Sequence, residues 1–342
     1  MKEFDNGLEK KFDFDFSQDK KITTEELKKF LEKDKDAILI FYGGEPLLEI
    51  GKIKEIIDKI KIPIRMQTNG LLLNKLPISY LKKIDKILIS LDGDKERTDN
   101  NRGKETFGKV TKNIEKIKEE GYDGELIARM CLSFPDIFTQ VKNLLSIGFT
   151  SIHWQIDAGF YKFDFDEKKF EKFTEEYNKE IEKLINFWIE NLKQGKVLKF
   201  YPFLGIIDSL LKNEKTLLRC GAGHSGYAIT LDGKIVACPI MNCIKNFEAG
   251  NLNDEPKNLK KFSVEEECQK CGYLDLCGGR CLYANKAQLW PKKGRELICK
   301  TVKFYIDKLK EKMPEIKSLI ANNIIKKEDF EYEKYFGPEI IP

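Results

Sequence analysis

The chain has 342 residues, and its 60 Lys and Arg against 56 Asp and Glu give a formal net charge of +4. At roughly 150 residues per domain this length predicts about two domains, and it excludes a peptide hormone or a disulfide-stapled mini-protein. So balanced a charge does not indicate a polyanionic partner, and binding to nucleic acid is not expected.

The N-terminal stretch MKEFDNGLEKKFDFDFS lacks the apolar core of a signal peptide. No window of the sequence approaches eighteen uninterrupted apolar residues, so no membrane partner is expected. Both observations predict a cytoplasmic protein.

Residues 22–160 alternate between helix-like and strand-like segments. The run at 36–42 is β-branched and aromatic and ends at a glycine pair. Four further apolar strands, each preceded by a helical segment, are expected at 62–70, 86–93, 125–133 and 151–159. This alternation predicts a parallel sheet covered by helices, with the polar strand ends gathered at its carboxyl edge, where such folds bind ligands.

The pattern changes after the fifth strand. Residues 165–196 read as one long helix with a core-facing apolar stripe, and the apolar segment 200–211 reads as a linker packed between two halves. Asp232-Gly233 indicates a hairpin that opens a smaller, cysteine-rich unit. We expect a first domain at 1–199, a second at 200–301, and a helix and tail at 302–342.

The cysteines carry the strongest chemical signal. Nine cysteines in a reducing compartment favour metal or redox chemistry over disulfides, and two histidines are too few for an imidazole-based site. Four of them form C-x2-C-x5-C-x3-C, at Cys268, Cys271, Cys277 and Cys281. Spacing alone leaves two readings open, iron–sulfur clusters with interleaved ligands or a tetrahedral zinc that staples the fold.

The full pattern resembles a known family. Cys220 and Cys238 flank a glycine upstream, as C-x12-G-x4-C, and Cys299 follows the four-cysteine motif. This order is similar to the SPASM domain of peptide-modifying radical S-adenosylmethionine (SAM) enzymes. YGGEP at 42–46 resembles the GGEP motif of that superfamily, supported by QTNG at 67–70 and SLDG at 90–93. GRCLYANK and the terminal EIIP resemble an archaeal peptide-modifying group.

The resemblance implies an α/β fold, a partial (β/α)6 TIM-like barrel followed by a small cysteine-rich α+β SPASM domain. It implies an oxidoreductase in which a 5′-deoxyadenosyl radical abstracts hydrogen from a peptide or protein. The implied cofactors are SAM and two auxiliary [4Fe-4S] clusters. The implied partners are the peptide substrate and an electron donor such as ferredoxin or flavodoxin.

A SAM pocket is expected at the carboxyl edge of the sheet. Gly43 and Gly44 allow main-chain carbonyls to approach a cationic amine, Glu45 adds a negative charge, and Pro46 directs the turn. The resemblance implies further cofactor contacts from strand ends and the following loop, at Thr68, Asn69, Ser90, Asp92 and Arg102. Ordinary turn formation is the alternative for Asn-Gly and Asp-Gly, as surface solvation is for the arginine.

The resemblance also divides the cysteines between two clusters. The first would be held by Cys220, Cys238 and Cys281, with Cys243 as the available fourth ligand or an open iron site in its place. The second would be held by Cys268, Cys271, Cys277 and Cys299. Cys131, inside a strand, reads as a small buried hydrophobe.

Two departures from the family concern the chemistry. In sulfatase-maturating relatives an Asp follows the second SPASM cysteine, whereas here Pro239 stands there, which argues against formylglycine formation. Asp157, at the end of the last expected strand, is the best alternative base, and a helix cap is its other reading.

The second departure is larger, because no C-x3-C-x2-C motif is present and no cysteine precedes Cys131. The count of five strands, where such a barrel has six, points the same way. We therefore expect that the barrel lacks its first strand and that a third, SAM-cleaving cluster requires a missing N-terminus. The alternative is a non-catalytic binding protein stapled by iron–sulfur or zinc.

Overall fold

The computed structural model describes residues 11–16, 21–156 and 165–336. Its core is a six-stranded parallel sheet in the sequential order β1-β2-β3-β4-β5-β6. The strands are β1 (Leu39–Phe41), β2 (Ile64–Thr68), β3 (Lys86–Ser90), β4 (Glu125–Leu132), β5 (Ser151–Ile156) and β6 (Lys199–Phe200). The α/β fold with a curved parallel sheet, consistent with a partial barrel, is therefore as predicted.

The predicted count of five strands is wrong, because a sixth strand follows the long helix. β6 has two residues, Lys199 and Phe200, which pair with Ser151 and Ile152. A two-residue strand has no periodicity that a sequence can reveal, so these residues read as the start of a linker. Tertiary pairing alone makes them part of the sheet.

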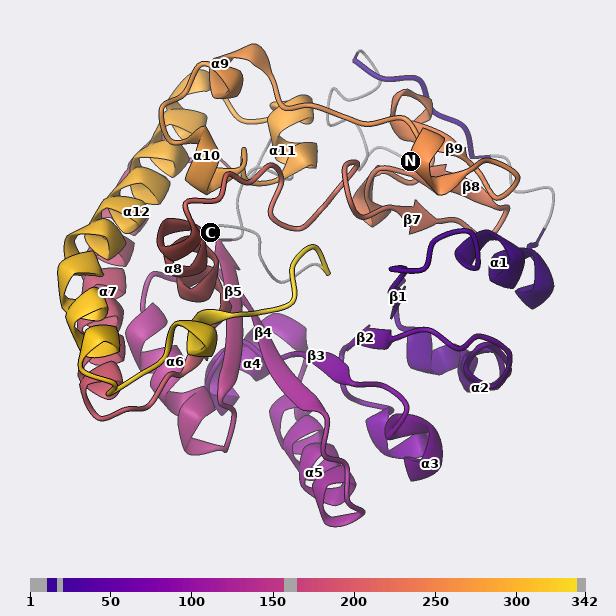
Figure 1. Cartoon of the computed structure of the whole chain (residues 1–342), viewed down its shortest axis with the longest axis horizontal. Coiled ribbons are helices and arrows are strands. Elements are labelled where there is room, and N and C mark those ends of the chain that lie inside the picture. The colour runs from indigo at the N-terminus through magenta and orange to yellow at the C-terminus, as the bar shows by residue number, and fades with distance from the viewer. Residues whose placement is uncertain (1–10, 17–20, 157–164, 337–342) are drawn as a thin grey trace.

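The helix α1 (Thr24–Leu31) precedes β1. Between β1 and β5 the described residues form five α-helices: α2 (Ile50–Lys59), α3 (Ile78–Leu81), α4 (Lys95–Arg102), α5 (Thr106–Glu119) and α6 (Ile137–Ser146). Figure 1 shows α2, α3, α5 and α6 on the convex side of the sheet. In α5 the buried Val110, Ile114 and Ile117 recur at spacings of three and four, so one face of the helix is apolar and packs on the strands.

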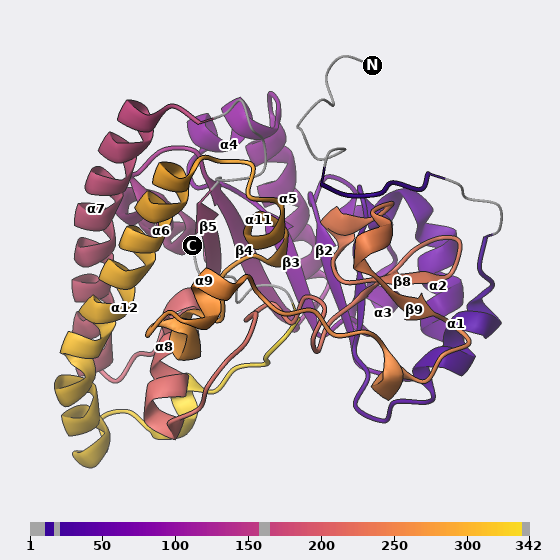
Figure 2. The same cartoon turned by 90° about the horizontal axis from the view of Figure 1, so that it is seen from above.

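The two long helices α7 (Glu167–Lys193) and α12 (Lys292–Ala321) pack against each other at one side of the sheet (Figure 2). The apolar stripe predicted for the first is confirmed, with Tyr177, Leu184 and Trp188 almost fully buried. The residue 301/302 boundary expected from the sequence lies inside α12. The apolar linker is α8 (Tyr201–Lys212), a buried helix. None of the helices in the described ranges is both long and apolar enough to cross a membrane.

The cysteine-rich segment, residues 220–299, lies across the concave side of the sheet (Figure 1). It contains β7 (Ala228–Ile229), β8 (Lys234–Val236), β9 (Glu248–Asn251), α9 (Glu266–Gln269), α10 (Leu274–Cys277), α11 (Leu282–Ala287) and the start of α12. The predicted hairpin is confirmed, since β7 and β8 pair antiparallel around Asp232-Gly233. The N-terminal residue Phe14 forms an antiparallel bridge with Ile244 of this segment.

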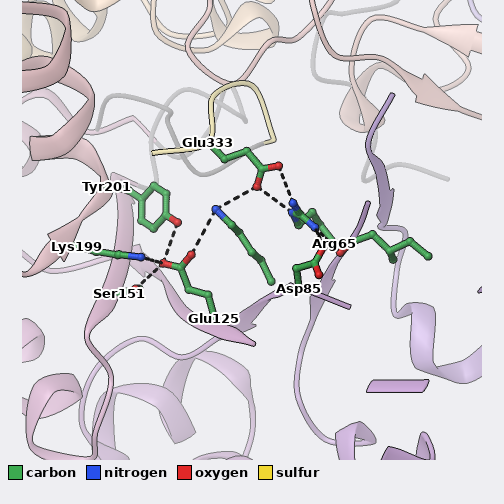
Figure 3. A network of polar contacts seen from close by, with 9 residues as sticks. Arg65, Asp85, Glu125, Ser151, Lys199, Tyr201 and Glu333 are labelled. Atoms are coloured by element: carbon green, nitrogen blue, oxygen red, sulfur yellow. Dashed lines mark hydrogen bonds and ion pairs between the residues drawn. The ribbon is translucent and has the colours of Figure 1, made fainter. Parts of the chain in front are cut away.

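The amino ends of the strands carry a network of charges on the concave face (Figure 3). Glu333, from the tail after α12, accepts hydrogen bonds from Arg65 Nε at 2.9 Å and Nη2 at 2.8 Å, and its Oε2 lies 3.1 Å from Lys86 Nζ. Lys86 also approaches Glu125, which accepts hydrogen bonds from Ser151 and Tyr201. The C-terminal tail is thus bound to the amino end of the sheet, away from the edge at which the site is expected.

Candidate active site

The loop after β1 presents open backbone at the carboxyl edge of the sheet. Gly43 has φ of +141°, which an L side chain rarely adopts. Apart from each glycine and its two chain neighbours, no heavy atom of the described residues lies within 4 Å of where a Cβ of Gly43 or Gly44 would stand. Pro46 begins the short 3-10 helix η1 (Pro46–Glu49), which turns the chain away. Main-chain groups of the two glycines are therefore accessible to a ligand.

Glu45 holds this loop to the neighbouring one. Its Oε1 accepts hydrogen bonds from Leu47 N at 3.0 Å and from Thr68 Oγ1 at 2.7 Å, and its Oε2 accepts from Asn69 N at 2.8 Å. The structure thus brings together the ends of β1 and β2, as the sequence analysis expected. The carboxylate that was expected to add charge near a ligand is engaged with the protein instead.

Asp92 and Arg102, both expected to touch the cofactor, form an ion pair with each other. Asp92 is 2% exposed, and its Oδ1 accepts from Arg102 Nη2 at 2.7 Å and from Cys131 N at 2.9 Å. Its other oxygen accepts from Asn101 Nδ2 at 3.2 Å. Asn101 lies next to Arg102 on α4, and nothing in the sequence distinguished it. Ser90 ends β3 beside this cluster and is partly buried.

A polar layer lies on the same concave face, farther along the strands than the charged network. Arg129 on β4 donates a hydrogen bond to Gln67 on β2, and its Nη2 donates to Gln155 on β5 at 3.1 Å. Cys131 follows Arg129 by two residues and so shares this face. It is partly exposed, which corrects its reading as a buried hydrophobe. Asp157, the expected base, lies outside the described residues.

The four cysteines assigned to the second cluster lie near one another. Burial raises the pKa of Cys277 to about 11, with the nearby thiols of Cys299 and Cys268 adding to the effect. Burial also raises the pKa of Cys268, again with a contribution from the thiol of Cys271. Asn285 Nδ2 donates to Cys268 Sγ at 3.1 Å. These four thiols therefore form one neighbourhood.

Two cysteines assigned to the first cluster form a separate neighbourhood. Burial raises the pKa of Cys238 to about 11, and the Cys281 thiol adds to this, whereas the Arg129 guanidinium opposes it. Cys281 caps α11 and is buried. Cys220 is partly buried and precedes a tight turn in which Gly221 O accepts hydrogen bonds from the backbone of residues 224–226.

Cys243 lies in different surroundings from those expected of a fourth ligand. It has φ of +66°, its carbonyl oxygen accepts from Asp15 N at 2.8 Å, and it lines a small hollow with Asp232 and Lys234. Burial raises the pKa of Cys243, and the negative charge of Asp232 raises it further, whereas no neighbouring thiol contributes to the shift. Its role as a ligand of the first cluster stays a prediction.

The donor chemistry of both sets fits iron–sulfur clusters, because thiolate sulfur is their usual ligand and polar N–H groups near the sulfurs are typical of such sites. Within the described ranges, no group of three His, Cys, Asp or Glu side chains lies close enough together to hold a single metal ion. Metal binding requires the thiolate form of cysteine, so it would release protons from thiols that are protonated beforehand.

The comparisons with known proteins agree with this geometry. Residues 12–138 match the radical SAM superfamily. This segment is a radical SAM domain. The segment contains the GGEP loop with Glu45, the Asp92–Arg102 ion pair and Arg129 on β4.

Curated relatives extend the likeness beyond the radical SAM domain. A cysteine-type anaerobic sulfatase-maturating enzyme of Clostridium perfringens (strain ATCC 13124) is 25% identical over 279 residues, which cover 70% of this chain and 72% of that protein. The radical SAM cyclopropyl synthase TigE of Paramaledivibacter caminithermalis is 23% identical, over 75% of this chain and 58% of its own length.

Solved structures share the fold. Native anSMEcpe with bound AdoMet superposes with a TM-score of 0.67 at 22% identity, covering 88% of this chain and 89% of that one. Streptococcus suis SuiB, solved with its precursor peptide SuiA, gives a TM-score of 0.50 at 15% identity, covering 77% of this chain and 66% of that one. The radical SAM domain and the cysteine-rich segment are thus arranged as a known architecture.

Proposed function

We propose that this chain acts as a radical SAM peptide- or protein-modifying oxidoreductase with two auxiliary [4Fe-4S] clusters. The auxiliary clusters would supply electron-transfer chemistry. SAM would supply the radical only with a third, SAM-cleaving [4Fe-4S] cluster, whose C-x3-C-x2-C ligands are not in this sequence. The proposal includes a cytoplasmic location, an electron donor such as ferredoxin or flavodoxin, and SPASM identity for residues 200–301.

One observation carries this proposal. The cysteines that lie near one another are those that the SPASM pattern assigns to the same cluster, with Cys277 beside Cys299 and Cys268, and Cys238 beside Cys281. Proximity along the chain does not explain this grouping of the cysteines. Cys281 is only four residues from Cys277, yet it lies near Cys238, which is 43 residues away in the sequence. A peptide substrate is supported by relatives and structural neighbours that act on or are bound to peptides.

The chain's own residues would bind and orient the cofactors and substrate. The open main chain of Gly43 and Gly44 would accept hydrogen bonds from the SAM ammonium, and Glu45 would hold that loop in position. Arg129 and Gln155 offer hydrogen bonds to a peptide at the concave face, beside Cys238. Asp157 is proposed as a proton acceptor.

The test is the metal content of the full chain after anaerobic reconstitution with iron and sulfide. Two cubane clusters predict about eight iron and eight sulfide per chain, with visible absorption bleached by dithionite. One or two zinc atoms and no sulfide would overturn the proposal in favour of a zinc-stapled binding protein. Iron rather than SAM cleavage is the readout because no cysteine precedes Cys131 in this sequence.

A further inference from the structure

Arg280 has an unusual backbone in the middle of the cysteine motif. α10 ends at Cys277, and the next three residues are all left-handed, with φ of +71° at Gly278, +87° at Gly279 and +62° at Arg280. The two glycines are required, since a Cβ would stand 2.9 Å from Leu218 N at the first and 2.3 Å from a Val264 methyl at the second. A long cationic side chain in the third such position is strained, and strain of this kind concentrates at functional sites.

The Arg280 side chain is held in place with most of its hydrogen-bonding capacity unused. Nη2 makes a long contact of 3.5 Å to Ile156 O at the carboxyl end of β5. Nε is buried and has no hydrogen-bond partner, and no carboxylate of the described residues forms an ion pair with the guanidinium. A buried N–H donor without an acceptor is costly, and in native proteins it often marks a bound group that satisfies it.

The surroundings of Arg280 indicate which group that is. The guanidinium lies near the thiols of Cys277 and Cys299. It also lies near the buried phenol of Tyr177 on α7. Among the described residues, the potential acceptors with metal-ligand chemistry that lie near the guanidinium are thus the thiols of the second cysteine set.

We propose that Arg280 donates its Nε–H to a sulfur of the second auxiliary cluster, held by Cys268, Cys271, Cys277 and Cys299, and thereby raises the reduction potential of that cluster. This inference rests on the proposed function. On reduction the cluster gains one electron and no proton, so its net charge becomes more negative by one. A cation and an N–H donor stabilise that state, because cluster potentials rise with positive charge and hydrogen bonds near sulfur.

The test is an EPR-monitored redox titration of the reconstituted full chain, poised with dithionite, for wild type and three variants. Arg280→Gly removes the guanidinium and places at φ +62° the residue best suited to it, so it is expected to fold at least as well as wild type. We expect it to shift one cluster signal to a more negative potential and to leave the other unchanged. Arg280→Lys keeps a charge but loses the fixed Nε–H, and its shift is expected to be smaller.

Arg97→Gln is the matched control, because it removes a guanidinium from α4, outside the cysteine-rich segment. It is expected to leave both potentials at their wild-type values. Unchanged potentials in Arg280→Gly, or equal shifts of both clusters, would overturn the proposal.

Iron content separates tuning from assembly. If Arg280→Gly loses iron, the Arg280→Lys variant becomes the test. Retention of iron by Arg280→Lys, together with a more negative reduction potential of one cluster, would support the proposal. Loss of iron from both variants would make Arg280 a residue needed to build the site and would refute a tuning role. A wild-type chain that takes up no iron would instead contradict the proposed function, whatever Arg280 does.

Discussion

At the scale of single residues, side chains expected to touch a cofactor hold the loops of the site in place. Glu45 receives three hydrogen bonds from two loops, and Asp92 receives three from Arg102, Asn101 and Cys131. Carboxylates at strand ends are therefore not free charges here. Their effect on a ligand is indirect, through the backbone that they position.

Glu45→Gln should weaken SAM binding and destabilise the chain by about 1–3 kcal/mol. The amide keeps one acceptor oxygen, and its NH2 cannot accept, so the variant loses either the bonds from Leu47 and Thr68 to Oε1 or the bond from Asn69 to Oε2. Equilibrium dialysis with labelled SAM and urea unfolding measure the two effects. Glu49→Gln, on the exposed end of η1, is the control and should change neither. Wild-type stability in the Glu45→Gln variant would show that these bonds contribute nothing.

At the scale of elements, short helices and glycine turns distribute the cysteines. Cys277 ends α10 and Cys281 begins α11, and the left-handed turn between them sends the two thiols to different neighbours. Asn285 on α11 reaches back to Cys268, so the helix that starts at a cysteine of one set contacts the other. The helix α11 therefore contacts cysteines of both sets.

Cys277→Ala and Cys238→Ala should each lose about half of the iron, because each removes a ligand from a different set and metal binding is linked to folding. Cys131→Ala is the matched control from the radical SAM domain and should keep all of it. Colorimetric iron and sulfide assays after reconstitution measure the outcome. Equal loss from Cys131→Ala would show that the assignment of ligands is wrong.

At the scale of the whole molecule, the C-terminal tail binds the amino end of the sheet. Glu333 is 17% exposed and joins Arg65 and Lys86, while Phe336 packs with Tyr201, Leu88 and Ile127. Burial opposes ionisation of Glu333, but hydrogen bonding from Arg65 and the charge of Lys86 outweigh it and hold its pKa below the ordinary value of 4.5. The tail therefore depends on charge as well as on apolar contact.

Glu333→Gln should lower the free energy of unfolding by about 1–3 kcal/mol at pH 7, since it removes the charge of one of the two carboxylates, Glu333 and Asp85, that pair with the buried Arg65. A depressed pKa contributes stability above the unfolded value, which is lost as the pH falls through the folded one. The deficit of the variant should thus be full above pH 4.5 and shrink in more acid solution.

Urea unfolding of both proteins from pH 7 downward measures this difference, and comparison at each pH cancels acid effects common to the two. Glu331→Gln is the control, since Glu331 is 57% exposed on the same segment. A deficit that stays constant with pH would contradict the electrostatic account.

Sequence by itself determined the features that depend on local pattern and spacing. Alternating apolar strands and amphipathic helices indicated the parallel sheet, Asp232-Gly233 indicated the hairpin, and the cysteine spacing indicated a metal site built on sulfur. Each is set by periodicity or by turn chemistry within a few residues, so no distant contact is needed to read it.

Tertiary structure alone decided the rest. β6 exists because Lys199 and Phe200 pair with β5, and Glu45 meets Thr68 because parallel strands end at one edge. The sequence assigned no role to Arg280, because its buried, unpartnered Nε and its left-handed backbone are visible only in the folded chain. The tail bound to Arg65 joins residues 268 positions apart, a contact that no local pattern encodes, because pairing energies between distant residues depend on where the fold brings them.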